Sequence, residues 1–347
     1  MKVAFEPYEN QENKYIVIMQ NCIQKMGHTI VPLKESKVKD CKIVILNWYE
    51  NSPYPRGSYK NLLMLIKRCI RILYFHMLKK KVVFVMHNKQ SHEQRVVSKW
   101  LQKFLVNHSD VIQIHSRPSL KYLPEKNVKK AFYIPHPNYI GEYPMTQRNY
   151  SREELKIGAE KLVYLFVGAV KPYKNIEMII EAAKKFDENV HFIIAGKPSD
   201  DSYKEQLLQQ IGNCDNITTI FKFIPDEDLV ALINTCDILV LPYDISSSLN
   251  SGTVFLAFSN KKTVIAPLIA SLEDIGENKN LFIGYTYKTQ EEHKKILEQK
   301  LKDTWHLFEK DKKYLDKMGQ RAYDYVKVNN STDVIIEKYR EMFRKLV

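Results

Sequence analysis

Three short apolar segments in the second half of the chain each end at a glycine or proline, followed by a loop and a helical pattern. They are residues 162–167 before Gly168, residues 191–195 before Gly196, and residues 238–241 before Pro242. Short buried strands that alternate with helices are typical of a parallel α/β sheet, which binds ligands beyond the carboxyl ends of its strands. We therefore expect a binding site on these loops.

The same loops carry groups that suit an anionic ligand. Lys171 and Lys174 follow the first strand, Lys197 follows the second, and Ser251-Gly252-Thr253 begins an apolar helix after the third. Lysine places a point charge on a phosphate, and the free N–H groups of a helix N-terminus bind anions. The sequence predicts a phosphate-ester site, although ordinary β–α turns and an ordinary N-cap would give the same local patterns.

The first half alternates in the same way. Strands are expected at residues 3–5, 42–46, 82–86, 111–115 and 132–134, and helices at 15–26, 59–79 and 91–106. Residues 135–147 lack periodicity and are the expected linker, after which residues 151–154 read as a capped helix start. We expect an α/β protein with two Rossmann-like parallel-sheet domains facing each other across a cleft. The domains are residues 1–147, joined by a last helix at about 332–347, and residues 148–331.

The net charge of +13 is concentrated in the first half. Residues 1–147 hold 24 lysines and arginines against 10 acidic residues, giving +14, and the rest hold 29 against 30, giving −1. Such asymmetry suggests a polyanionic partner, either acidic lipid or nucleic acid. No apolar run approaches the roughly 18 residues of a membrane span, no signal peptide follows Met1, and the five cysteines lack any C-x-x-C. These features predict a cytoplasmic protein.

The helix expected at residues 59–79 has a basic stripe. Lys60, Lys67 and Arg71 share one side of the helical projection, and the opposite apolar face is expected to pack on the core. That face consists of Leu62, Leu65, Ile66, Cys69, Ile72, Leu73 and Met77. Cations beside large apolar groups suit an anionic membrane surface, and a solvated helix face is the alternative. No RRM or helix-turn-helix signature accompanies the charge, so no nucleic-acid partner is expected.

Two polar motifs bear on catalysis. His87 directly follows the strand at 82–86, where it could bind a substrate hydroxyl or act as a general base; a structural histidine is the alternative. Asp226-Glu227-Asp228 resembles a D-x-D metal motif, but it follows Pro225 and precedes an apolar run, as the first turn of a helix does. No metal site is predicted.

Together these residues resemble the nucleotide-binding domain of GT-B-fold glycosyltransferases, especially the bacterial enzymes of glycosyltransferase family four. The resemblance covers about residues 162–267, in the order Gly168 and Lys174, residues 194–196, 223–229, 236–242, 251–253 and 263–267. It implies metal-independent transfer of a sugar from a UDP- or GDP-linked donor, without any other cofactor, to an acceptor on the first domain. Lys174 and the backbone of Ser251, Gly252 and Thr253 would meet the diphosphate. The nucleobase would lie by Gly196, Lys197, Phe223 and Ile224, and His87 would face the sugar.

The chain departs from the family pattern at three positions. Ala169 stands where the family usually has arginine, for which Lys171 is a candidate replacement, and Ser248 and Leu256 stand where it has glutamates. Retention or inversion is thus left open, and inversion would need a base such as His87, Glu6, Glu9 or Glu93. We expect a transferase at the inner face of the cell membrane, acting on a lipid-linked or oligosaccharide acceptor in capsule or exopolysaccharide assembly. A nucleotide-sugar epimerase and a non-catalytic glycan- or nucleotide-binding module are the alternatives.

Overall fold

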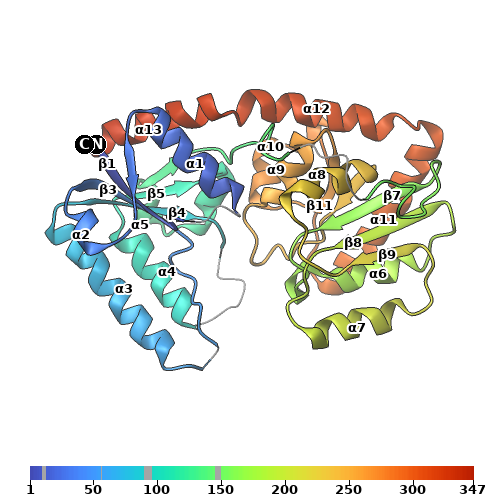
Figure 1. Ribbon diagram of the computed structural model, residues 1–347, viewed down its shortest axis with the longest axis horizontal. Coiled ribbons are helices and arrows are strands. Elements are labelled where there is room, and N and C mark those ends of the chain that lie inside the picture. The colour runs from blue at the N-terminus through green and yellow to red at the C-terminus, as the bar shows by residue number, and fades with distance from the viewer. Residues whose placement is uncertain (10–12, 56, 90–95, 145–149) are drawn as a thin grey trace. The chain divides into compact units, whose positions relative to one another are not determined.

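In the computed structural model the chain divides into two compact units (Figure 1). The structure describes residues 1–9, 13–55, 57–89, 96–144 and 150–347. The first unit contains residues 1–137, 246–250 and 329–347, and the second contains residues 138–245 and 251–328. The first stretch of the first unit thus ends at Pro137, and the unit also takes in a segment, 246–250, that the sequence pattern places with the second.

Segment 246–250 joins the first unit through hydrogen bonds to the loop after His87. The Lys89 N–H donates to the Ser247 carbonyl over 3.1 Å, and Asn88 forms an antiparallel bridge with Ser248. Backbone pairing of this kind leaves no trace in hydrophobic periodicity, which is why the sequence pattern does not reveal it.

The first unit is a six-stranded parallel sheet in the order β2-β1-β3-β4-β5-β6. Its strands are β1 (Lys2–Glu6), β2 (Thr29–Val31), β3 (Cys41–Asn47), β4 (Lys81–Met86), β5 (Val111–Ile114) and β6 (Ala131–Tyr133). Its helices are α1 (Lys14–Lys25), α2 (Glu35–Val38), α3 (Lys60–Met77), α4 (Val96–His108), η1 (Arg117–Tyr122), α5 (Glu125–Val128) and α13 (Thr332–Leu346). Helices α1 and α13 lie together on one face of the sheet, and α3 and α4 on the other (Figure 1). The strand order reverses between β1 and β3, and such switch points are where open α/β sheets bind ligands.

The second unit is also a six-stranded parallel sheet, in the order β12-β11-β10-β7-β8-β9. Its strands are β7 (Leu162–Val167), β8 (Val190–Ala195), β9 (Ile217–Ile220), β10 (Ile238–Val240), β11 (Thr263–Pro267) and β12 (Ile283–Tyr285). Its helices are η2 (Pro172–Lys174), α6 (Ile176–Ala183), α7 (Asp201–Ile211), α8 (Asp226–Thr235), α9 (Gly252–Ser259), α10 (Ala270–Ile275), η3 (Glu277–Lys279), α11 (Gln290–Lys310) and α12 (Tyr314–Asn329). Every residue of β7 and β8 is buried, as strands covered by helices on both faces require. The switch point of this sheet lies between β7 and β10.

Two local expectations are wrong. The first is the helix start expected at 151–154. The two hydrogen bonds of a capping box are present there, since the Ser151 N–H donates to Glu154 Oε2 and the Glu154 N–H donates to Ser151 Oγ. No helix follows, because Lys156 takes a left-handed conformation (φ 56°) that ends the turn.

The second concerns α3, where most of the face expected in the core is exposed. Leu62 is 56% exposed, Ile66 48% and Met77 78%, whereas Ile72 and Phe75 are buried. This helix is apolar on several sides, so its pattern does not identify the side that meets the sheet. No helix in the described ranges combines the length and apolar character that crossing a bilayer requires.

Candidate active site

In the second unit, the loops after β7 and β8 run side by side beyond the sheet. The Gly168 N–H donates to the Ala195 carbonyl over 3.1 Å, and the Val170 N–H donates to the Lys197 carbonyl over 3.1 Å. Gly196 has φ 141°, and a Cβ placed there would lie 1.7 Å from the Gly168 carbonyl oxygen. Only glycine allows these two backbones to approach so closely, which leaves a bare backbone surface at the strand ends.

Lys174 lies at the end of η2, where this surface meets the loop after β10. Its Nζ is 4.0 Å from the centre of the Tyr243 ring, and burial, followed by the charge of Lys171, lowers the pKa of Lys174 to about 8. The neighbouring Asn175 is left-handed, and its Nδ2 donates to the Pro242 carbonyl over 2.7 Å. Lys174 is thereby held at the β7/β10 switch point as a partly desolvated cation.

The N-terminus of α9 belongs to the same site. The Tyr243 hydroxyl lies 2.7 Å from Ser251 Oγ, and although Ser251 is the N-cap residue, its side chain makes no capping hydrogen bond. The first N–H groups of α9, at Gly252 and Thr253, therefore keep their capacity to bind an external anion, aided by the helix dipole. Tyr243 thus connects a lysine to a helix N-terminus, a combination suited to a phosphate or diphosphate.

The remaining predicted donor residues occupy the edge of this surface. Lys171 and Lys197 are exposed, Phe223 is 60% exposed in the loop between β9 and α8, and Ile224 is buried. Asp226, Glu227 and Asp228 form the first turn of α8, as their position after Pro225 predicts. Within the described ranges no group of His, Cys, Asp and Glu side chains is placed to hold a metal ion.

In the first unit, His87 is part of a cluster of rings at the carboxyl ends of β3, β4 and β5. Trp48 stacks on His87 with 4.0 Å between ring centres, and Tyr15 from α1 meets both His87 and His115 edge-on at 5.2 and 5.4 Å. His136 lies 5.6 Å from His115. These side chains surround the β1/β3 switch point from several elements.

Hydrogen-bond partners fix the proton position on His87. Asn47 Nδ2 donates to the Glu6 carbonyl over 3.0 Å, which turns Asn47 Oδ1 toward His87 Nε2 at 3.0 Å. Because an amide oxygen only accepts, His87 must carry its hydrogen on Nε2. The basic lone pair of His87 is consequently on Nδ1.

The other two imidazoles carry their hydrogens on Nδ1. His115 Nδ1 donates to the Ile134 carbonyl over 2.8 Å, and its Nε2 accepts from the Tyr15 hydroxyl over 2.9 Å. His136 Nδ1 donates to the Pro137 carbonyl over 2.9 Å. Burial lowers the pKa of His115 to about 4 and that of His136 to about 3. Burial, followed by the neighbouring rings of His115 and His136, lowers the pKa of His87 well below 6.5. All three rings are neutral at physiological pH.

The carboxylates predicted for catalysis have different surroundings. Glu6 ends β1 in a half-buried position, and burial raises the pKa of its carboxyl. Glu93 lies outside the described residues.

Sequence reasoning missed Tyr15, Asn47, Trp48 and Tyr243. Asn47 and Tyr243 stand close after predicted strands, so their position at a sheet edge was a usable signal, whereas nothing in the sequence marks Tyr15.

A family profile, that of the glycosyl transferases group 1, matches residues 147–324, which is more than half of the chain. The chain belongs to the group 1 glycosyl transferases. The matched region contains every one of the second-unit site residues described above.

Solved structures agree with this assignment at the level of the fold. The glycosyl transferase is similar to HepE from Anabaena in complex with UDP (TM-score 0.70, 14% identity, 99% of this chain and 100% of that one). It is also similar to sucrose-phosphate synthase from Thermosynechococcus elongatus (TM-score 0.74, 13% identity, 100% of this chain and 99% of that one). A third similar structure is that of WaaG, a glycosyltransferase involved in lipopolysaccharide biosynthesis (TM-score 0.64, 13% identity, 98% of this chain and 99% of that one). No curated protein sequence matches significantly. The predicted GT-B architecture of two Rossmann-like units is confirmed.

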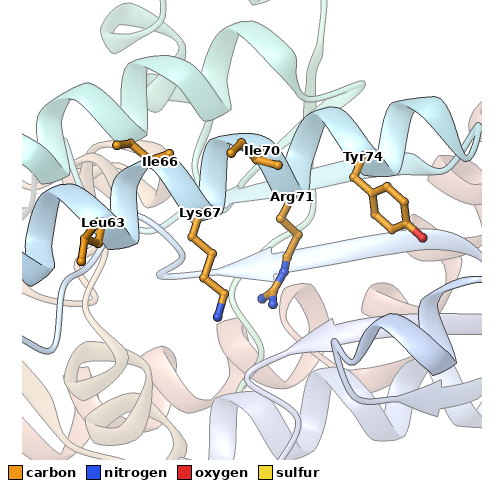
Figure 2. A pocket seen from close by; sticks show the side chains of 6 residues that line it. All are labelled: Leu63, Ile66, Lys67, Ile70, Arg71 and Tyr74. Atoms are coloured by element: carbon orange, nitrogen blue, oxygen red, sulfur yellow. The ribbon is translucent and has the colours of Figure 1, made fainter.

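The glycosyl transferase also presents an exposed apolar surface on α3, which we call the α3 apolar surface. It consists of Leu62, Leu63, Ile66, Ile70, Leu73 and Met77, each between 47 and 78% exposed. A groove of about 500 Å³ runs along this helix. Figure 2 shows Lys67 and Arg71 extending from α3 next to each other, between Leu63 and Tyr74. The predicted basic positions Lys60 and Lys67 are exposed and Arg71 is half-buried.

Proposed function

We propose that this glycosyl transferase moves a sugar from a UDP-linked donor, held by the second unit, to an acceptor held by the first. The observation that carries the donor half is the arrangement of Lys174, Tyr243 and the uncapped N-terminus of α9. HepE, which shares the fold, has been solved with UDP and with UDP-glucose. That relationship favours UDP over GDP as the nucleotide.

The arrangement suits the chemistry of the leaving group. As the bond to the sugar breaks, negative charge grows on the diphosphate, and preorganised positive groups in a partly desolvated site stabilise it. Lys174 and the N–H groups of α9 supply that charge from protein groups, and we propose that no metal ion is needed. Lys171 would replace the missing arginine at position 169 as a second cation.

His87 is the proposed contact to the transferred sugar or the acceptor. Its neutral ring offers the basic Nδ1, with Asn47 and Trp48 fixing the orientation. A product of inverted anomeric configuration would assign His87 the role of general base, for which Glu6 and the exposed Glu9 are the other candidates within the described residues. A retained configuration would leave His87 the role of orienting the sugar.

The acceptor is proposed to be a lipid-linked glycan, reached at the inner face of the cell membrane during capsule or exopolysaccharide assembly. The first unit carries 28 lysines and arginines against 12 acidic residues, giving +16, and the second carries 25 against 28, giving −3. Exposed leucine and isoleucine side chains beside Lys60 and Lys67 can enter the headgroup region of an anionic leaflet, and Trp100 on the adjoining α4 is 63% exposed. Charge and apolar surface thus occur on the same unit.

Liposome retention tests the membrane part. Wild type should pellet with vesicles of phosphatidylcholine and phosphatidylglycerol, and Ile70→Ser with Met77→Ser should remain in solution, as should Lys60→Glu with Lys67→Glu. A matched double change in the second unit, Lys184→Glu with Lys204→Glu, should pellet like wild type. Retention of the α3 variants at the wild-type level would refute the membrane role of this helix.

Thermal shift tests the donor part. UDP, GDP, CMP and ADP, each with their common sugar conjugates, are added to wild type, Lys174→Ala and the exposed control Lys184→Ala. A ligand that binds only the folded state raises its melting temperature. UDP and one UDP-sugar should shift wild type and the control, but Lys174→Ala much less. No shift with any nucleotide would overturn the donor assignment.

A non-catalytic nucleotide-binding module is the second candidate, favoured by one observation. The positions of the two family glutamates hold Ser248, which is buried, and Leu256, which is 7% exposed within α9. Such a module would show the UDP shift without releasing UDP from UDP-sugar. Conversion of the UDP-sugar into its epimer, in the absence of any acceptor, would instead identify an epimerase.

A further inference from the structure

A second cavity of the first unit is lined by several lysines. Its volume is about 410 Å³, and it lies among the end of β4, helix α4 and the turn η1. The lining includes Met86, Lys89, Lys99, Gln102, Lys103, Tyr122 and Lys126. Four lysines thus converge on one cavity, and none of its lining residues is acidic.

This cavity has a defined frame. The Gln102 side chain is buried, and its Nε2 donates to the Asn88 and Lys89 carbonyls, both over 3.2 Å, which holds the chain after β4 against α4. The Lys89 Nζ lies 4.3 Å from the centre of the Tyr122 ring. One cation is therefore positioned by packing, with an aromatic face beside it.

Three further lysines add charge at exposed positions. Lys99 and Lys103 are one helical turn apart on α4, and Lys126 lies in α5, all exposed. Neither Lys99 nor Lys126 forms an ion pair with any residue that the structure describes. Like charges around one cavity repel each other, so a multivalent anion that neutralises Lys99, Lys103 and Lys126 binds favourably.

We propose that this cavity binds the phosphate or diphosphate group of a glycosylated acceptor. Lysine binds phosphate as a point charge, and a multiply charged phosphate neutralises several lysines where one carboxylate would neutralise a single charge. The Tyr122 ring, 37% exposed, offers a face for the attached sugar. Met86 lines the cavity and directly precedes His87, so the cavity and the proposed acceptor site both lie at the carboxyl end of β4. The inference rests on the proposed function for its use, but not for the binding itself.

The test measures binding of glucose 1-phosphate to the full chain by isothermal titration calorimetry. Excess UDP keeps the donor site occupied, and the titration is repeated without UDP. The cavity variant carries three changes, Lys99→Gln, Lys103→Gln and Lys126→Gln. The control variant loses the same charge from exposed positions of the first unit outside the cavity, through Lys25→Gln, Lys42→Gln and Lys129→Gln.

Glucose 1-phosphate should bind wild type and the control within twofold of each other, and the cavity variant at least tenfold more weakly. Glucose should not bind, and glucuronate should bind at least tenfold more weakly than glucose 1-phosphate. Equal affinities of the two triple variants, or no binding to wild type, would overturn the proposal. Because all six lysines are exposed, unchanged melting temperatures should show that both variants fold.

Vesicles distinguish the source of the phosphate. Phosphatidylcholine vesicles with a polyprenyl diphosphate are compared with phosphatidylcholine–phosphatidylserine vesicles of equal charge. Stronger retention on the polyprenyl diphosphate vesicles, reversed by added glucose 1-phosphate, identifies a lipid-linked phosphate as the ligand. Equal retention on both kinds of vesicle, with glucose 1-phosphate binding intact, identifies a soluble phosphate ester. If the cavity variant binds glucose 1-phosphate normally and wild type transfers sugar, this inference alone is refuted. If the cavity variant loses glucose 1-phosphate binding but wild type transfers no sugar, only the proposed function is refuted.

Discussion

The lowered pKa of Lys174 predicts that nucleotide binding weakens as the pH rises above neutrality. In the free protein burial lowers this pKa from 10.5 to about 8, so the ammonium is about half deprotonated at pH 8. A bound diphosphate stabilises the charged form and moves the pKa back toward its ordinary value. Binding therefore takes up a proton between pH 8 and 10.5, and the full affinity is present only below pH 8.

The size of the effect follows from the titration of one group. With a pKa near 8, the protonated fraction of Lys174 falls from about 0.9 at pH 7 to about 0.1 at pH 9, so the dissociation constant of UDP should rise about tenfold. The phosphates of UDP contribute little, because their last ionisation is complete near pH 7.

Calorimetric titration of UDP at pH 7, 8 and 9, at constant ionic strength, measures this change directly. Lys174→Met keeps the length of the side chain without the charge, and should bind UDP more weakly at pH 7 with no dependence on pH up to 9. Lys184→Met should behave as wild type. A flat wild-type profile, or the same decline in Lys174→Met, would show that Lys174 is not the group that meets the diphosphate.

Three further changes test other parts of the site. Gly196→Ala should lower the free energy of unfolding by about 3 kcal/mol, because its Cβ meets backbone at a positive φ, whereas Gly158→Ala should cost under about 0.5 kcal/mol; urea unfolding compares them. Tyr243→Phe should weaken UDP binding about three- to tenfold in calorimetry, since it frees Ser251 Oγ to cap α9 in place of the ligand; unchanged affinity would contradict this role. His87→Ala should keep the UDP thermal shift while slowing sugar transfer about 100-fold or more, and a normal rate would remove it from the site.

The layout of the fold could be predicted from the sequence because the central strands of both sheets are covered on both faces. A parallel strand buried on both faces is a continuous apolar run, and β7, β8 and β4 all show it with clear glycine or polar ends. The positions of the loops after β7, β8 and β10 followed from the same logic, since residues just after such strands share one edge of the sheet. The place of Lys174 at this edge could thus be predicted from the sequence, and its role in donor binding stays a proposal.

Contacts between distant segments could not be predicted in this way. The orientation of His87 depends on Asn47 and Trp48, which lie about 40 residues earlier, and on Tyr15 in α1. Tyr15 and Trp48 have no pattern that distinguishes a site from a core, and the position of Asn47 after a strand marks the sheet edge but not its hydrogen bond to His87. The exposed side of α3 was misjudged for a related reason, since an apolar residue looks the same in a sequence whether it meets the sheet or a membrane.

The discontinuity of the first unit has a consequence for biosynthesis. Its β-sheet is complete after residue 137, but α13, which packs on α1 and contributes the buried Tyr339, is translated only after residues 138–328, most of which form the second unit. The apolar side of α1 must therefore stay uncovered while about 190 further residues emerge, at ribosomal rates for about 10 to 40 seconds. A nascent chain that stalls before residue 332 should bind holdase chaperones through α1, and this dependence should disappear once α13 leaves the ribosome.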